Sequence, residues 1–213
     1  MSLDLASLAA WGLVALVGYL VGSISFGYIV AKYVKNVDLR RVGSGSTGGT
    51  NAFRTLGRGP GVLVSVLDIL KGIAAVWFAS LLFGRGDDPG QIAQATAAIA
   101  VVAGHCWPFV LRGQGGRGVA TGFGALLFVA TPAWASAVAA FAIALALTRM
   151  VSVGSLASVV GALVGYLLFS ATGWLSFHWA TLAFILVAGT IVYVRHLPNI
   201  QRIVRGVEPR LRA

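Results

Sequence analysis

Long apolar runs alternate with short polar segments along most of this chain. A helix that crosses a bilayer needs roughly 20 predominantly apolar residues, and several of the runs reach that length. Pro60, at the start of the second run, is compatible with a first helical turn, because its missing N–H would have no helical partner there. The pattern predicts membrane-spanning helices over Leu5–Val30, Pro60–Phe83, Gln91–Val110, Val153–Ala171 and Trp174–Val194.

The run Val119–Arg149 is too long for one ordinary span and has Thr131-Pro132 in its middle. Since proline disrupts a helix interior, we expect two short helices that meet at this point. Met150–Ser152 is then a turn, and a basic, amphipathic tail follows from Arg195. The pattern therefore predicts seven spans.

Basic residues gather on alternate connections. If the N-terminus lies outside, then Lys32–Arg58, Arg112–Arg117, Arg149 and the tail face the cytoplasm and hold fourteen of the sixteen Lys and Arg residues. Such an excess of positive charge is typical of cytoplasmic loops. A single helix over Val119–Arg149 would place the tail outside and lose this asymmetry. The predicted fold is a single all-α integral membrane domain over residues 1–213, with seven transmembrane helices, two of them short and central, the N-terminus outside and the C-terminus cytoplasmic.

Composition agrees with a membrane protein and narrows its chemistry. The chain is 58% hydrophobic and 10% charged, with a mean hydropathy of +0.87, whereas soluble domains carry about 25% charged residues. A net charge of +10 in so apolar a chain indicates topology and anionic partners rather than nucleic acid. The lone Cys106 excludes an internal disulfide and a multi-cysteine metal site. Only six acidic residues are present, so a magnesium site of several carboxylates is hard to build, and we predict no metal and no cofactor.

A glycine- and hydroxyl-rich segment, Val42–Asn51, follows the first span and reads V-G-S-G-S-T-G-G-T-N. Glycines permit tight turns that point successive N–H groups into one concavity, which suits phosphate oxygens. Ser44, Ser46, Thr47 and Thr50 add hydroxyl groups to this segment. Arginines stand on both sides of it: Arg40, Arg41, Arg54 and Arg58. The alternative is a flexible connection or close helix packing through small residues, and the residues alone do not decide between the two.

A second basic, glycine-rich segment, Arg112–Gly118, separates the third and fourth spans. Both segments contain G-x-G-x-x-G, at Gly43–Gly48 and Gly113–Gly118. Neither follows a strand of a βαβ unit, as dinucleotide-binding loops do, and the lysine of a Walker A motif is missing. Generic phosphate binding survives both rejections. On the predicted topology these segments share the cytoplasmic side with the Ser152/Ser155 turn and the tail.

Two ionisable residues interrupt the second span. Asp68 and Lys71 lie about 12 and 16 Å along the helix from Pro60. Because ionisable groups at such depth are costly, they usually face a polar interior. We expect an intramembrane ion pair in which Arg54 or Lys71 is the partner of Asp68, and Lys71 could also reach a substrate phosphate.

The three histidines lie in different settings. His178 is in an outer segment and is expected at the membrane interface, and His105, at the end of the third span, is expected to pack as a hydrogen-bonded structural residue. His196 opens the basic tail with Asn199 three residues later, where the basic loops converge, which favours a ligand role. Ser152 and Ser155 could cap a helix or line the same site, and their spacing does not separate these alternatives.

Seven segments, spread over nearly the whole chain, recur in one known family in this order and spacing. They are G-S-I-S-F-G at Gly22–Gly27, V-G-S-G-S-T-G-G-T-N-A-F-R at Val42–Arg54, L-D-I-L-K-G at Leu67–Gly72, G-H-C-W-P at Gly104–Pro108, G-Q-G-G-R-G-V-A-T at Gly113–Thr121, the serine turn, and H-L-P-N-I-Q-R-I-V-R-G-V-E at His196–Glu208. Together they resemble the bacterial acyl-phosphate:glycerol-3-phosphate acyltransferases, small membrane enzymes that begin phospholipid synthesis. That family's seven-helix fold, N-terminus outside, agrees with the predicted topology.

The resemblance implies transfer of a fatty acyl group from acyl phosphate to the 1-hydroxyl of glycerol 3-phosphate, which gives lysophosphatidic acid and phosphate at the cytoplasmic face of the bacterial inner membrane. A mixed anhydride is already activated, so positioning and charge neutralisation can supply much of the acceleration without a covalent intermediate. Besides the two substrates and membrane lipid, we expect no nucleic acid and no obligate protein partner, and a monomer. The main alternative is a transporter of a small phosphorylated anion, although no inverted repeat is visible.

The same resemblance assigns roles to individual residues. The acyl-phosphate cradle is expected to comprise Ser44, Gly45, Ser46 and Gly48, with Arg117 in support. Glycerol 3-phosphate is assigned to Arg54 together with the catalytic candidates Ser152, His196 and Asn199. Further substrate-binding candidates are Asn51, Lys71, Gly115, Gly116, Gly118, Ser155 and Glu208. His196 is the only obvious protein base, while proton transfer to the donor's own phosphate is the alternative that the resemblance favours. No histidine begins a His-x-x-x-x-Asp motif, so acyl-CoA is not the predicted donor.

Some positions depart from the family pattern. The family often has asparagine at Ser46 and alanine at Gly49, which leaves the loop chemistry plausible. Arg117 occupies a position commonly held by lysine, and it replaces a compact ammonium with a planar fork. Leu197-Pro198 replaces more polar residues between His196 and Asn199.

Overall fold

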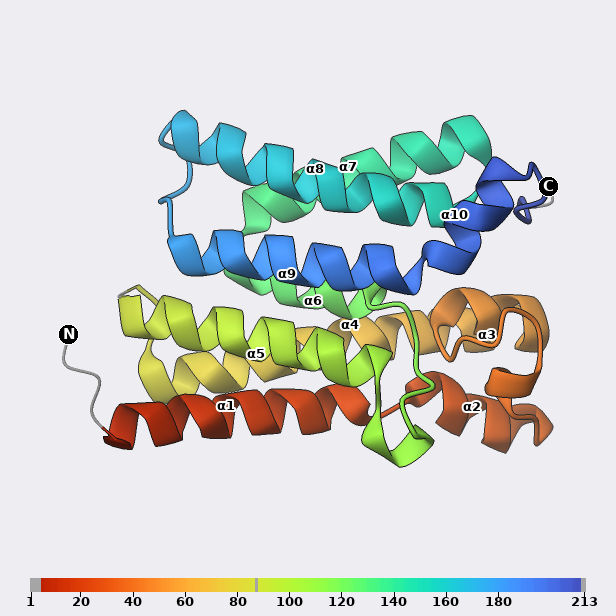
Figure 1. Cartoon of the computed structure of the whole chain (residues 1–213), viewed down its shortest axis with the longest axis horizontal. Helices are drawn as coiled ribbons and strands as arrows, with labels where there is room; N and C mark the ends of the chain where they lie inside the picture. The colour runs from red at the N-terminus through yellow and green to blue at the C-terminus, as the bar shows by residue number, and fades with distance from the viewer. Residues whose placement is uncertain (1–4, 87, 212–213) are drawn as a thin grey trace.

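The computed structural model describes residues 5–86 and 88–211, and all regular secondary structure within these ranges is helical. Most of the helices lie side by side along the long axis of the molecule (Figure 1). The main helices are α1 (Leu5–Ser23), α4 (Arg58–Phe83), α5 (Asp88–Cys106), α6 (Val119–Val129), α7 (Thr131–Thr148), α8 (Val151–Ala171) and α9 (Trp179–Arg195).

Several of these elements are long and apolar enough to cross a membrane. Five stretches qualify alone: Leu8–Lys35, Arg58–Phe83, Asp88–Leu111, Thr131–Thr148 and Val151–Ala171. α9 qualifies only together with α10 (Leu197–Val204), to which it is joined at a bend of 58°. The short α6 extends only about 16 Å, roughly half of a hydrocarbon core. For residues 5–86 and 88–211 the all-α class is confirmed with five or six candidate spans, and the count of seven and the orientation stay predictions.

The predicted break within Val119–Arg149 is confirmed. α6 ends at Val129 and α7 begins at Thr131, with Ala130 outside the helical conformation (φ −150°, ψ 78°). Pro132 falls in the first turn of α7, where its missing N–H removes no helical hydrogen bond. Farther from the break, Phe123 of α6 and Phe141 of α7 meet edge to face, with ring centroids 6.0 Å apart, so the two helices also contact each other there.

The first predicted span, Leu5–Val30, falls largely within the candidate span Leu8–Lys35, but it is not one continuous helix. α1 ends at Ser23, and a separate helix, α2 (Phe26–Lys35), follows Ile24 and Ser25. The break leaves carbonyl groups without helical partners, and Lys71 from α4 donates to those of Gly22 and Ile24. Hydropathy did not reveal the break because the apolar run continues through it.

The connection between the first span and Pro60, which includes the first glycine-rich segment, is not irregular throughout. It contains a 3₁₀ turn, η1 (Leu39–Arg41), and the helix α3 (Gly49–Leu56), and α4 already begins at Arg58. The glycine, threonine and asparagine at the start of α3 are weak helix formers. The helix is nevertheless stable in this context because Asn51, Ala52 and Leu56 are buried along one side.

Smaller differences occur at other boundaries. α5 begins at Asp88 and is followed by the 3₁₀ turn η2 (Phe109–Leu111), and α8 begins at Val151. α9 begins at Trp179 instead of Trp174, because the preceding turn is tied down by Tyr166. The Tyr166 hydroxyl donates to the His178 carbonyl (2.9 Å) and accepts from the His178 N–H (2.7 Å).

Small residues allow the helices to approach closely. A β-carbon at Gly22 of α1 would overlap the main chain of α5, and one at Gly104 of α5 would overlap the main chain of α1. The same holds for Gly72 of α4 and Gly124 of α6. In a bilayer there is no hydrophobic driving force for helices to associate, so close van der Waals packing of this kind stabilises the contact between them.

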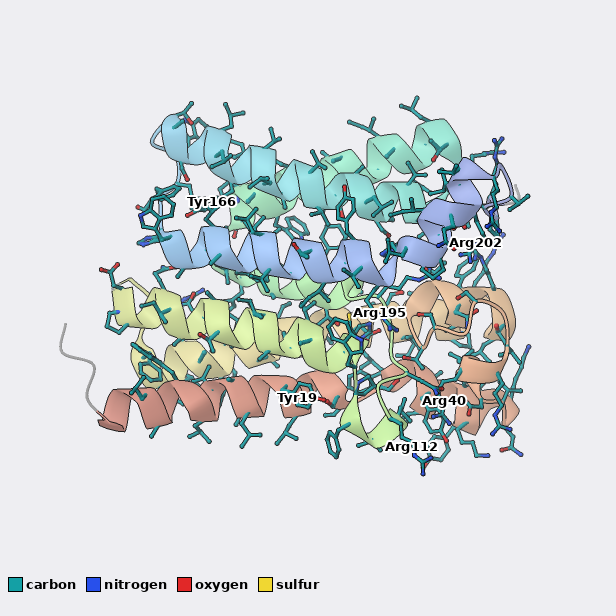
Figure 2. All side chains as sticks on the ribbon, viewed as in Figure 1. Tyr19, Arg40, Arg112, Tyr166, Arg195 and Arg202 are labelled. Carbon is teal, nitrogen blue, oxygen red and sulfur yellow. The ribbon has the colours of Figure 1, made fainter. Side chains whose placement is uncertain are left out.

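The two ends of the helix bundle differ in charge. Arg40, Arg112, Arg195 and Arg202 lie in the half that holds α2, α3 and α10, whereas Tyr166 lies at the other end (Figure 2). We call these the basic end and the opposite end. Both glycine-rich segments belong to the basic end, as the sequence predicted.

Candidate active site at the basic end

The side chain of Asn51 holds the first glycine-rich segment in shape. Its amide nitrogen donates to the carbonyls of Leu39 (3.2 Å), Val42 (3.0 Å) and Ser46 (2.9 Å), and its oxygen accepts from the Ser44 N–H (2.9 Å). Asn51 is only 2% exposed. The structure shows that the Asn51 amide orders the first glycine-rich segment, and the predicted contact of this residue with substrate stays a prediction.

Glycine is required at the turn that Asn51 closes. Gly43 and Gly45 have φ of +60° and +70°, in the left-handed region that favours glycine. A β-carbon at Gly43 would in addition overlap the Asn51 oxygen. The segment is therefore a built turn, which argues against the alternative of a flexible connection.

The second glycine-rich segment is fixed by His105 and Arg195. The Gly116 N–H donates to the His105 carbonyl (3.0 Å), and Gly116 lies so close to the His105 ring that a β-carbon would overlap it. Arg195 donates from Nε to the Gly116 carbonyl (3.0 Å) and from Nη2 to the Gly115 carbonyl (3.1 Å). The two segments also touch each other, because the Thr47 N–H donates to Gly115 (3.4 Å).

A cavity of about 330 Å³ lies between these segments and the ends of the surrounding helices. Predicted site residues that line it are Ser44, Ser46, Gly48, Asn51, Arg117, Gly118, Ser152, Ser155 and His196. Unpredicted lining residues are Gly49, Thr50, Ser65, Ile69, His105, Val119, Ala120, Phe123, Phe141 and Val151. The polar connections that the topology placed on one side thus meet at one shared cavity.

The Arg117 guanidinium is suited to bind an anion in this cavity. Burial lowers the pKa of its guanidinium to about 10, with the charges of Arg202, Arg54 and Arg195 acting in the same direction and that of Glu208 against it. The group is still a cation at neutral pH. Among the described residues, Arg117 forms no hydrogen bond and no ion pair, so its donors are free for a ligand.

His196 is buried at the junction of α9 and α10, on the wall of the cavity. Its Nδ1 lies 2.8 Å from the Val192 carbonyl. A carbonyl only accepts, so Nδ1 carries the proton and Nε2 is an acceptor. Burial lowers the pKa of this imidazole to about 4, although the bond to Val192 opposes that shift.

Glu208 ties the tail to the site. Its carboxylate accepts from Asn199 Nδ2 (2.7 Å) and from Arg202 Nε (2.7 Å). Burial opposes ionisation, but the bond from Asn199, the nearby Ser152 hydroxyl and the bond from Arg202 together keep the pKa of Glu208 below its usual range. The Ser152 hydroxyl and the Asn199 oxygen are buried without a well-formed hydrogen bond of their own.

Several predicted site residues do not line the cavity: Gly45, Arg54, Lys71, Gly115, Gly116, Asn199 and Glu208. Arg54 donates to the Pro209 carbonyl in the tail (3.5 Å). Lys71 pairs with Asp68 (2.8 Å), and it is one of the two partners, Arg54 or Lys71, that were predicted for this carboxylate. Its predicted contact with a substrate phosphate is not supported by this position.

Two residues, His105 and Arg195, have roles at the site that sequence reasoning missed. His105 was expected to be structural only, yet its ring lies on the cavity wall. Arg195, the first residue of the basic tail, was assigned no individual role. Its position directly after the last apolar run was the available signal, but its partners lie about 80 residues away in the sequence.

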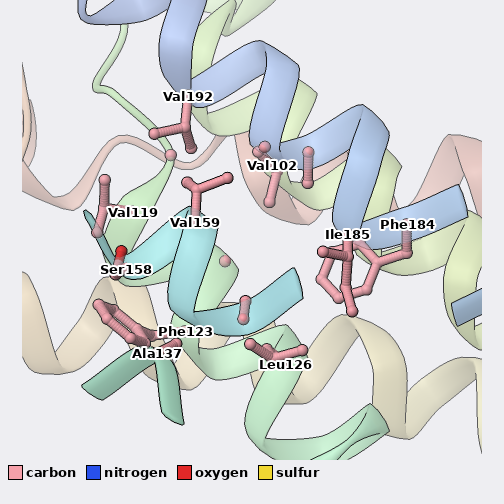
Figure 3. Close-up of a pocket in the computed structure, with 15 residues that line it drawn as sticks. Val102, Val119, Phe123, Leu126, Ala137, Ser158, Val159, Phe184, Ile185 and Val192 are labelled. Atoms are coloured by element: carbon pink, nitrogen blue, oxygen red, sulfur yellow. The ribbon is translucent and has the colours of Figure 1, made fainter. Parts of the chain in front are cut away.

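An apolar pocket of about 60 Å³ adjoins the cavity. It lies among α5, α6, α7, α8 and α9, with the Val102, Leu126, Val159, Phe184 and Ile185 side chains around it (Figure 3). Gly118, Val119 and Phe123 line both spaces. A ligand with a charged head and an apolar tail could therefore occupy both at once.

Comparisons with known proteins agree over nearly the whole chain. The family model described as glycerol-3-phosphate acyltransferase matches residues 12–206. A glycerol-3-phosphate acyltransferase of Thermosynechococcus vestitus is 38% identical over 208 residues, covering 95% of each chain. Another, of Gloeobacter violaceus, is 40% identical over 193 residues and covers 91% of each chain.

Solved structures give the same result for the fold. The crystal structure of PlsY, an integral membrane glycerol 3-phosphate acyltransferase, in its glycerol 3-phosphate form superposes with a TM-score of 0.84 at 33% identity, over 95% of this chain and 96% of that one. Its lysophosphatidic acid form gives a TM-score of 0.82 at 31% identity, over 95% of each chain.

Proposed function

This chain belongs to the glycerol-3-phosphate acyltransferase family, and from that premise we propose that it transfers a fatty acyl group from acyl phosphate to the 1-hydroxyl of glycerol 3-phosphate. The products are 1-acyl-glycerol 3-phosphate and inorganic phosphate. It is an integral membrane acyltransferase, and lipid synthesis follows from the family. The proposal concerns the donor, the hydroxyl that reacts, and the residues that act.

One observation carries the proposal: Arg117, a half-buried arginine with no hydrogen bond or ion pair among the described residues, lies on a cavity that adjoins an apolar pocket. A charge held partly out of water is stabilised by a counter-charge, and a phosphate supplies one with acceptors that suit a guanidinium. Acyl phosphate has such a head and an apolar tail. The tail is expected to enter past Val119 and Phe123, where the two spaces meet.

Glycerol 3-phosphate is expected beside the donor, against Ser152 and His196. The Ser152 hydroxyl has no well-formed hydrogen bond and can serve the glycerol hydroxyls or the phosphate. Asn199 and Glu208 lie behind Ser152 and His196 and hold the tail in place. PlsY in its glycerol 3-phosphate form shows that a protein of this fold binds that acceptor.

The reaction needs few protein groups. The 1-hydroxyl oxygen attacks the acyl carbonyl carbon and forms the ester, and the bond from that carbon to the phosphate oxygen breaks, so phosphate leaves with the electron pair. The hydroxyl proton passes to the donor phosphate or to His196 Nε2. Neutral His196 is compatible with either path, and Arg117 with the loop N–H groups would stabilise the charge on the leaving phosphate.

We place the site on the cytoplasmic side of a bacterial inner membrane, because the basic end carries most of the positive charge. We also propose that the single domain of residues 1–213 works as a monomer, since all the groups named above come from one chain.

The test is a purified, lipid-reconstituted enzyme given acyl phosphate and glycerol 3-phosphate. We expect lysophosphatidic acid and phosphate in equal amounts, neither without the acceptor, and no product when acyl-CoA replaces the donor. Lysophosphatidic acid formed from glycerol 3-phosphate with acyl-CoA as the sole donor would contradict the proposed donor. Counterflow of glycerol 3-phosphate across the liposome membrane without phosphate release would instead support a transporter.

A further inference from the structure

We propose that Asp68, Lys71 and His105 form a positioning cluster that aligns the two glycine-rich segments with each other. None of the three is needed for the transfer step described above. The inference rests on the proposed function, since the alignment matters for the binding of acyl phosphate.

The cluster is a buried group of three ionisable side chains on α4 and α5. Asp68, Lys71 and His105 are 1%, 4% and 6% exposed. Lys71 Nζ lies 2.8 Å from Asp68 Oδ1, and His105 Nδ1 lies 3.4 Å from the same oxygen. One carboxylate oxygen thus faces both a residue of its own helix and a residue at the end of α5.

His105 connects the cluster to the second segment. Its Nδ1 faces Asp68, and its opposite ring edge, at Nε2, meets Gly116. Its carbonyl also accepts the Gly116 N–H. A rotation of the imidazole would therefore press on Gly116 and displace its neighbour Arg117.

Lys71 connects the cluster to the first segment. Its ammonium donates to the Gly22 (3.1 Å) and Ile24 (2.9 Å) carbonyls at the break between α1 and α2. The break sets the direction of α2, and α2 packs directly on the first segment, because a β-carbon at Gly27 would overlap the Thr47 carbonyl.

The two connections are closed by a direct contact between the segments. Thr47 of the first segment donates to the Gly115 carbonyl of the second, while the cluster contacts the second segment through His105 and reaches the first through α2. A simple ion pair would need only two partners. This cluster is connected to both segments, which is why we assign it a positioning role beyond stability.

The first experiment separates positioning from stability. Asp68→Leu and Lys71→Met each leave an unpaired buried charge and should lower Tm strongly, whereas the double variant removes both charges and should recover most of that loss. Even with its Tm recovered, the double variant should have a KM for acyl phosphate about tenfold or more above that of wild type. Its KM for glycerol 3-phosphate should lie within about twofold of wild type. Recovery of both KM and Tm would overturn the proposal.

The second experiment uses His105. His105→Ala should raise the KM for acyl phosphate, and His105→Asn should restore most of it, because the Asn Nδ2 can replace the ring Nδ1 beside Asp68. Ser80→Ala is the matched control: it removes a buried hydroxyl of α4, bonded only to the Trp77 carbonyl, and should leave both KM values unchanged. A His105→Asn variant as impaired as His105→Ala would contradict the role of the Asp68 contact.

A readout independent of activity separates this inference from the proposed function. Hydrogen–deuterium exchange of the Gly115–Gly118 amides should be slow in wild type and clearly faster in the double variant, but not in Ser80→Ala. If the wild-type protein released no phosphate from acyl phosphate, the proposed function would fail. The hydrogen–deuterium exchange rates of these amides would still decide whether the cluster positions the two segments. Unchanged exchange in the double variant would end the inference even in an active enzyme.

Discussion

The bundle has a polar cavity at each end, and we propose a phosphate site in the one at the basic end. The cavity at the basic end measures about 330 Å³ and that at the opposite end about 270 Å³. Both have an arginine and a histidine on the wall: Arg117 and His196 at the basic end, Arg85 and His178 at the other. Neither size nor residue type distinguishes them.

The difference lies in whether the polar groups already have partners. At the opposite end the Arg85 guanidinium stacks on the Phe128 ring at 4.0 Å, and the Tyr166 hydroxyl is engaged by the main chain of His178. At the basic end Arg117 is half-buried and forms no hydrogen bond within the described part of the chain, and the buried Ser152 hydroxyl has no well-formed one. Buried donors left free by the protein are the better sign of a ligand site.

A pair of glycines gives the largest expected contrast. Gly116→Ala would drive a methyl group into the His105 ring, and a displacement of that kind near reacting groups should lower kcat/KM for acyl phosphate by about 100-fold or more. Gly86 lines the opposite cavity and has open space where a β-carbon would go, so Gly86→Ala should leave the rate unchanged. Equal effects of the two substitutions on phosphate release would remove the distinction.

The two arginines come next. Arg117→Ala should lower kcat/KM for acyl phosphate by about 10- to 100-fold, since a charge-assisted hydrogen bond contributes roughly 1.5–3 kcal/mol. Arg117→Lys keeps the charge and should be affected less. Arg85→Ala removes the stacking on Phe128 and should change kcat/KM by less than about twofold. The idea fails if Arg85→Ala matches Arg117→Ala in steady-state kinetics.

A smaller effect is expected from two serines. Ser152→Ala should raise the KM for glycerol 3-phosphate about 2- to 10-fold, as for one neutral hydrogen bond. Its Tm should not fall, because the hydroxyl has no well-formed bond in the folded protein. Ser176→Ala, in the opposite cavity, should change neither quantity. A lower Tm with an unchanged KM for Ser152→Ala would assign this serine to the fold.

The smallest effect concerns pH. With a pKa of about 4, His196 is neutral above about pH 5 and becomes charged only as pH falls through that value. The ratio of wild-type to His196→Gln rates should therefore be constant between about pH 5.5 and 8, since both profiles then follow the substrates. A ratio that changes by close to tenfold per unit around pH 6.5 would show that His196 titrates there.

Much of the fold could be read from the sequence because apolar length and the positions of Lys and Arg both constrain membrane helices. Thr131-Pro132 marked the break between α6 and α7 through proline chemistry. The break at Ile24 had no such mark, because it depends on Lys71, which lies 47 residues away and satisfies the freed carbonyls.

The candidate site was only partly readable for the same reason. Ser44, Ser46 and Gly48 could be recognised from residue type within a glycine-rich segment, and they do line the cavity. Gly115 and Gly116 also belong to a glycine-rich segment, but Arg195 and His105 hold them in a position where they do not line the cavity. Composition indicates a phosphate-binding loop, whereas the direction in which each residue faces depends on tertiary partners.

The most direct measurement is a structure of the protein with glycerol 3-phosphate and a non-hydrolysable acyl phosphonate. The account predicts two head groups in the basic-end cavity, the phosphonate against Ser46, Gly48 and Arg117, and its chain leading past Phe123 into the apolar pocket. Head-group density beside Arg85 in the opposite cavity, with the basic-end cavity empty, would contradict it.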